Sequence, residues 1–168
     1  MVKKKRALSN YEKLVKKYNL PKLLELDREF EVAAYIHDLE GLNHHYQMLL
    51  EIRRRMTDRF NSWINYLHAL IFPNQGSMID MKESEQFTED DKNLISDLIN
   101  KLMFMNRVGI KLDLLNSEQE EAKYIRNYYK IWMDLKNAVK FIVDKNIEAW
   151  HKDARGLPES EEKLPYYG

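Results

Sequence analysis

Apolar residues recur at alternating steps of three and four between residues 32 and 70 of this 168-residue chain. The positions of this heptad stripe are Val32, Tyr35, Leu39, Leu42, Tyr46, Leu49, Arg53, Met56, Phe60, Trp63, Leu67 and Leu70. Such a register predicts a helix that buries one face, and Arg53 is its one polar member. We interpret Arg53 either as a structural residue that fixes packing or as part of a functional surface.

The stripe is broader than that of a two-stranded coiled coil. With Val32 at heptad position a, the flanking e and g positions are also apolar, and they include Ile36, Leu50, Ile52, Ile64, Tyr66 and Ile71. In a two-stranded coil these positions are usually Glu or Lys. The face therefore needs more than one neighbouring helix. We predict an all-α protein, with an antiparallel four-helix-bundle-like domain, a short basic N-terminal helix and an extended C-terminal tail.

Capping and turn signals set the expected boundaries of these segments. We expect a basic N-terminal arm over 1–20, a bundle over 21–152 with helices at about 21–39, 42–72, 88–115 and 118–151, and an extended tail over 153–168. The short helix of the arm is expected to begin near Ser9 and to end near Asn19. The acidic stretch between Pro73 and Phe87 is expected to be a long connecting loop.

The segment before residue 42 also carries apolar residues that do not follow the heptad stripe. Its apolar residues Leu23, Leu26, Phe30 and Ala33 lie on the side opposite to the heptad stripe. The chain therefore either breaks or has partners on both sides. A break near residues 38–42, at Gly41, is the preferred interpretation because glycine is unfavourable inside a helix. The alternative is one continuous helix from residue 21 to residue 72.

The composition limits the kinds of site and the cellular location that we expect for this protein. The chain has no Cys, which excludes disulfides and thiolate metal sites, and no apolar run long enough to cross a bilayer. We expect a cytoplasmic protein without membrane contact. The net charge is zero but unevenly spread. Residues 1–22 carry eight Lys and Arg against one Glu, a net of +7, and residues 74–91 carry six Asp and Glu against one Lys, a net of −5.

Candidate chemistry is sparse. His37, His44 and Glu51 share a heptad column, but that column is the outermost one, whereas metal ligands in bundles point inward. The pair Glu148 and His151 is interpreted as a solvated helix end. A carboxylate cluster at residues 118–121 is explained by compensation of the helix dipole. We therefore predict no catalytic residue, no metal site, no cofactor and no small-molecule substrate. A metal-dependent bundle enzyme is the third hypothesis.

The leading hypothesis is a non-enzymatic interaction or scaffold module that binds a protein partner or itself. The candidate partner-interface residues are Arg53, Arg54, Met103, Phe104, Ile110, Tyr166 and Tyr167. The alternative is a nucleic-acid accessory protein, because a lysine-rich arm can neutralise phosphates. The candidate nucleic-acid contacts are Lys3, Lys4, Lys5, Arg6, Lys13, Lys16 and Lys17, with Tyr11 and Tyr18 either stacking on bases or docking the arm.

Overall fold

The computed structural model describes residues 2–36 and 45–154, and these residues form helices and no strand. The helices are α1 Val2–Tyr18, α2 Leu23–Phe30, α3 Ala33–Ile36, α4 His45–Ile71, α5 Met78–Glu85, α6 Glu89–Leu112 and α7 Glu118–Asp153. The prediction of an all-α, bundle-like protein is confirmed. None of the helices within these residues is both long and apolar enough to cross a membrane.

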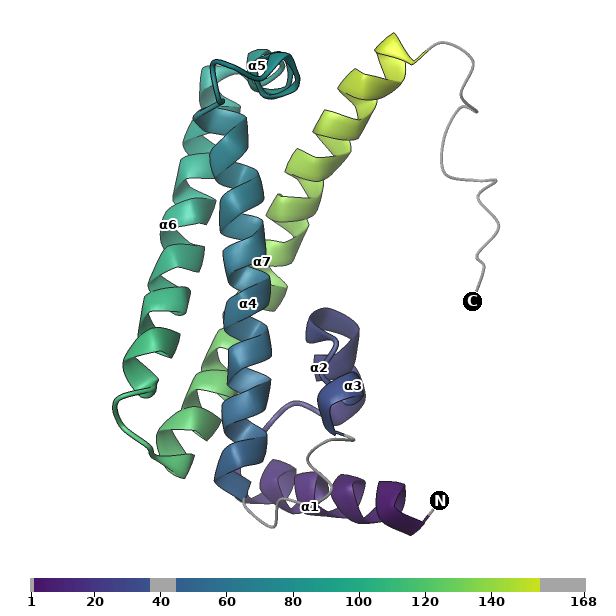
Figure 1. The fold of residues 1–168 in the computed structure, drawn as a ribbon, viewed down its shortest axis with the longest axis vertical. Helices are drawn as coiled ribbons and strands as arrows, with labels where there is room; N and C mark the ends of the chain where they lie inside the picture. Colours follow the sequence, from purple (N-terminus) through teal and green to yellow (C-terminus); the bar gives the residue numbers. More distant parts are fainter. Residues whose placement is uncertain (1, 37–44, 155–168) are drawn as a thin grey trace.

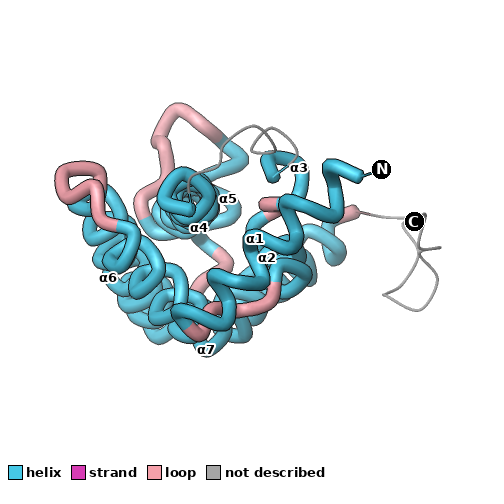
Figure 2. Tube along the Cα trace, turned by 90° about the horizontal axis from the view of Figure 1, so that it is seen from below, coloured by secondary structure: helices cyan, strands magenta, loops and turns pink. Residues whose placement is uncertain are grey.

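Three long helices form the bundle: α6 runs antiparallel to α4 and α7, and α4 packs on both of the others (Figure 1). The heptad stripe of α4 faces them: Leu49, Met56, Phe60, Leu67 and Leu70 are all buried. The neighbouring Ile52 and Ile64 are buried as well, which confirms that the apolar face is wider than a two-stranded seam. Seen from below, α6, α4 and α7 surround a common core (Figure 2).

Gly109 of α6 lies at a close contact between α6 and α4. A Cβ atom built on Gly109 would lie 2.3 Å from Cγ2 of Thr57 and 3.1 Å from the hydroxyl oxygen of Tyr124. The neighbouring side chains also bridge helices here, because Asn106 donates to the Thr57 carbonyl and Tyr124 donates to the Met105 carbonyl. Only a residue without a side chain allows this approach.

Helix α1 is docked on the bundle by its aromatic side. Tyr11 and Leu14 are buried, and the Tyr11 hydroxyl donates to the Pro21 carbonyl at 2.8 Å. The helix begins at Val2, earlier than the predicted start near Ser9, and ends as predicted before Asn19, whose φ of 52° is left-handed. Of the two interpretations of Tyr11, docking is the one that the structure supports.

The predicted continuous helix over 21–39 is wrong, because α2 ends at Phe30 and the chain turns at Glu31. Glu31 has a left-handed φ of 54°, and its N–H donates to the Asp27 carbonyl. The Asp27 carboxylate then accepts from the N–H of Ala33 at 2.6 Å and starts α3. This turn lets Phe30 and Val32, which lie on opposite sides of a continuous helix, both be buried. The predicted break at Gly41 lies outside the described residues.

The expected loop between α4 and α6 contains a helix. Helix α5 begins after Ser77, whose hydroxyl accepts from the N–H of Asp80, and it is held by the Trp150 indole, which donates to Glu83 at 2.8 Å. The starts predicted for the next two helices are correct. Thr88 and Asp91 form the capping box of α6, and Ser117 caps α7.

Candidate interaction groove

A groove runs between the end of α2 and the outer faces of α4 and α7. Its floor is apolar and consists of Trp63 from α4 and Trp132, Val139 and Val143 from α7. The two indole rings stack with their centroids 6.4 Å apart and an interplanar angle of 26°. The groove encloses about 250 Å³ and is open to solvent. We define this surface, with the charged residues described below, as the α2–α4–α7 groove.

Glu29 of α2 ties one wall of the groove to α7. Its carboxylate is buried and accepts from the Trp132 indole N–H at 2.9 Å and from Lys136 Nζ at 2.6 Å. Burial alone would raise the pKa of Glu29. The hydrogen bonds from Lys136 and Trp132 together outweigh this effect and keep the pKa below its usual value. Glu29 is therefore a charged anchor that orients Trp132 and Lys136 at the groove.

The rim of the groove is mainly cationic. Arg28, Arg59, Lys136 and Lys140 line it together with one carboxylate, that of Glu29. Lys140 pairs with Asp144 one turn further along α7, and the Lys140 side chain is 64% exposed. A surface pair of this kind contributes little to stability and is readily exchanged. The rim can therefore offer cations to an incoming acidic group.

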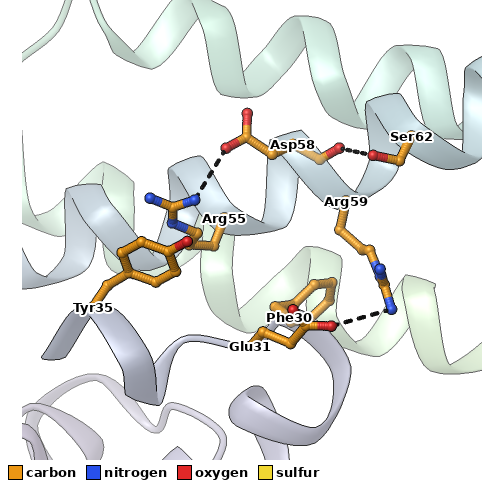
Figure 3. A pocket seen from close by; sticks show the side chains of 7 residues that line it. All are labelled: Phe30, Glu31, Tyr35, Arg55, Asp58, Arg59 and Ser62. Carbon is orange, nitrogen blue, oxygen red and sulfur yellow. Dashed lines mark hydrogen bonds and ion pairs between the residues drawn. The ribbon is translucent and has the colours of Figure 1, made fainter.

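A second, smaller pocket of about 150 Å³ adjoins the groove, and Arg59 belongs to both. In Figure 3, the guanidinium of Arg55 lies against the ring of Tyr35, at 3.3 Å from its centroid, and Arg59 extends towards Glu31. Asp58 approaches Arg55 from the same helix. This pocket is close to charge-balanced, so it extends the α2–α4–α7 groove without adding much positive charge.

The consecutive residues Arg53, Arg54 and Arg55 point to three separate places. Arg55 reaches the small pocket, and Arg54 is exposed. Arg53 is only 2% exposed, and its guanidinium donates to Glu121 at 3.0 and 3.3 Å and to Asp113 at 2.5 Å. Burial alone would lower the pKa of Arg53, but the hydrogen bonds to Glu121 and Asp113 outweigh this effect and raise the pKa. The structural interpretation of Arg53 is thus favoured, and its assignment to a partner interface is wrong because its side chain is inaccessible.

Three other predicted interface residues lie on α6, which does not line the groove. On α6, Phe104 is 63% exposed and Ile110 is also exposed, whereas Met103 packs partly against the core. Tyr166 and Tyr167 lie outside the described residues. A role for Phe104 and Ile110 in binding stays a prediction.

The predicted nucleic-acid contacts are only partly described. Lys13 and Lys16 are exposed on α1, whereas Lys17 donates to Glu118 at 2.9 Å. The side chains of Lys3, Lys4, Lys5 and Arg6 lie outside the described part of the chain. Tyr11 is buried, and Tyr18 is partly buried and donates to Glu118 at 2.7 Å, so both tyrosines contribute to the docking of α1.

The acidic residues at the start of α7 do not converge on one point. Glu118 accepts from α1, Glu120 lies near Lys123, and Glu121 is buried against Arg53. Among the described residues, no group of three or more Asp, Glu, His or Cys side chains could hold a metal ion. The histidine column at residues 37 and 44 falls outside those residues.

Sequence reasoning missed the groove itself. The heptad stripe predicts Trp63 as a core position, and neither Glu29 nor Lys136 belongs to a recognisable motif. The available signal was a carboxylate at Glu29 between Leu26 and Phe30, on a face that is otherwise apolar and buried. The chain matches no protein-family model, and neither a curated protein nor a solved structure shows significant similarity to it.

Proposed function

We propose that this protein is a helical interaction module that binds an acidic, amphipathic helix of a protein partner in the α2–α4–α7 groove. The observation that carries the proposal is an apolar floor of two stacked tryptophans and two valines beneath a rim of four cations. Recognition of this kind places the apolar face of a helix in a groove and its charged side chains at the edge.

Among the described residues, α2 and α3 cover only part of the fourth side of the bundle. Helices α2 and α3 have eight and four residues, which correspond to roughly 12 and 6 Å of helix, whereas the 27 residues of α4 extend for about 40 Å. Figure 1 shows α2 and α3 beside only part of α4. An added helix would continue the cover that α2 begins.

The rim selects for acidic partners. Arg28, Arg59 and Lys140 are exposed cations, so Glu or Asp residues flanking the apolar face of a bound helix would meet opposite charge. Such complementarity speeds association and disfavours basic partners. The apolar floor then supplies the larger share of the affinity, because buried aromatic contacts dominate interfaces.

The proposal is tested with synthetic helical peptides and fluorescence anisotropy. One labelled peptide carries Leu at positions i, i+3, i+4 and i+7 and Glu elsewhere, a second carries Lys in place of Glu, and a third is a scramble of the first. A labelled DNA duplex is measured in the same series. Emission from the tryptophans reports contact with the floor, where Trp63 and Trp132 lie.

Matched charge reversals locate the binding. Lys140→Glu combined with Arg28→Glu is expected to weaken the acidic peptide by about tenfold or more, with the loss reduced in high salt. Lys101→Glu is the control, because Lys101 is 52% exposed, pairs with a carboxylate four residues away as Lys140 does, and lies on α6 outside the groove.

Three results would overturn the proposal. They are equal binding of the acidic and basic peptides, an equal effect of the Lys101 and groove variants, and tight duplex binding without peptide binding. The last result would favour the nucleic-acid hypothesis, which would then be tested with Lys13→Glu and Lys16→Glu because both lysines are exposed.

A further inference from the structure

Two segments of opposite net charge lie at opposite ends of the bundle, each near exposed apolar side chains. Helix α5 lies at one end of the long axis and α1 at the other (Figure 1). Residues 74–91, which include α5, have a net charge of −5, and residues 1–22, which include α1, have a net charge of +7. Since α4 alone separates these ends by about 40 Å, the two charges cannot neutralise each other within one chain.

The acidic end also has an apolar pocket. Met78, Ile79 and Met81 of α5 line it together with Trp150 of α7, and it encloses about 400 Å³. Its polar lining consists of Gln75, Lys82 and Glu85. Met78 is 89% exposed and Ile79 is largely exposed. Methionine side chains adapt to the shape of a partner, and an exposed patch of this kind indicates an interaction site. We call this surface, with the acidic residues around it, the α5 end.

The basic end offers an exposed apolar group. The turn between α6 and α7 presents Leu114, which is 82% exposed, and Leu115. This turn lies next to α1, because Lys17 and Tyr18 both donate to Glu118 at the start of α7. Exposed Lys13 and Lys16 lie on the same helix as Lys17. We call this surface the α1 end.

We propose that the α5 end of one copy binds the α1 end of a second copy, with Leu114 entering the α5–α7 pocket and the lysines of α1 facing the carboxylates around α5. A second copy is the occupant because this chain itself carries both complementary surfaces. Its net charge of zero leaves no overall repulsion between copies. The contact joins two different surfaces, so it is heterologous and extends as a head-to-tail chain unless it closes into a ring.

The test is the mass of the protein by sedimentation velocity and light scattering over a concentration series in low and high salt. The wild-type mass is expected to rise with concentration, and the association constant is expected to fall by about tenfold or more in high salt because the end charges are exposed. A monomer at every concentration and ionic strength would overturn the proposal.

Two single substitutions identify the geometry. Met78→Asp introduces a carboxylate into the apolar surface of the α5 end and leaves the α1 end unchanged. Leu114→Asp introduces a carboxylate at the α1 end and leaves the α5 end unchanged. Both residues are highly exposed, so neither change disturbs the core. Each variant alone is expected to stay monomeric, whereas an equimolar mixture is expected to form one-to-one dimers and nothing larger, because each dimer has one intact contact and two spoiled ends.

Phe141→Asp is the control, since Phe141 is 53% exposed on α7 and belongs neither to the two ends nor to the predicted interface residues. It is expected to leave self-association unchanged. A mixture of the Met78 and Leu114 variants that remains monomeric would overturn the head-to-tail geometry, as would association that only Phe141→Asp abolishes. None of these outcomes bears on peptide binding in the α2–α4–α7 groove, so the two proposals fail independently.

Discussion

Replacement of Arg53 by methionine is expected to destabilise the protein by about 3–5 kcal/mol, because it leaves a buried carboxylate without its cation. Glu121 of α7 is 1% exposed, and it accepts two hydrogen bonds from the guanidinium of Arg53 on α4. Methionine fills most of the volume of the arginine stem, so the loss comes mainly from the orphaned charge. For a chain of this size the loss corresponds to a fall in melting temperature of roughly 6–20 °C.

The assay is urea denaturation followed by circular dichroism, with the melting temperature as a second readout. Arg55→Met is the matched control, because Arg55 lies on the same helix and pairs with Glu51, but its side chain is 29% exposed. Its loss is expected to be at most about 1 kcal/mol. The double variant Arg53→Met with Glu121→Leu removes both buried charges and is expected to recover most of the stability, since apolar replacements of buried ion pairs are often neutral or better.

Two outcomes would refute this reasoning. One is that Arg53→Met lowers the free energy of unfolding no more than Arg55→Met does. Burial would then not make the Arg53–Glu121 pair more important for stability than the more exposed pair of Arg55. If the double variant is as unstable as Arg53→Met alone, the loss arises from packing around the arginine stem and not from an uncompensated charge.

Two further predictions concern the α4–α6 crossing and the start of α6. Gly109→Ala is expected to lower the free energy of unfolding by about 1–3 kcal/mol despite the better helix propensity of alanine, because its Cβ overlaps Thr57. Adding Thr57→Ser should restore most of this loss, as measured by urea denaturation of the single and double variants. A Gly109→Ala variant that is more stable than the wild type would contradict the close approach. The hydrogen bonds from Lys145 and Thr88 lower the pKa of Asp91 to about 2. Because this folded pKa lies below the unfolded value of about 3.9, Asp91→Asn should cost stability above pH 4, and the difference should fade as the pH drops to about 2. A gap between the two melting temperatures that does not change with pH would show that Asp91 is not the responsible group.

The long helices were predictable because their signals are local. The heptad stripe of α4 and the capping residues Thr88 and Ser117 act over one or two turns, and the structure follows them closely. Helix α5 was missed because its sequence has no apolar periodicity. It depends instead on the Ser77 cap and on a contact between Glu83 and the distant Trp150.

The turn at Glu31 illustrates a partial success. The change of apolar face is visible in the sequence and favours a break near residues 38–42 over one continuous helix from residue 21 to residue 72, whereas the described turn lies at Glu31. The position of the break was not visible, because a left-handed glutamate gives no glycine or proline signal. Burial of both Phe30 and Val32 decides where the chain turns.

The candidate sites depended even more on packing. The α2–α4–α7 groove is anchored by a bond between Glu29 and Trp132, which are 103 residues apart. No periodicity or spacing along the chain relates two residues at that separation. The opposite charges of the two ends were readable from the sequence, but the exposure of Met78 and Leu114 beside them was not.

The sequence by itself determined that this protein is helical, that α4 buries a wide face, and where α6 and α7 begin, because helix periodicity and capping depend on residues within about four positions of each other. Only the tertiary structure decided that Arg53 pairs with Glu121, that Tyr11 docks α1, and that a cationic groove remains open beside Trp132. These outcomes depend on how far each helix slides and turns against its neighbours, and that register is set by the packing of the whole core.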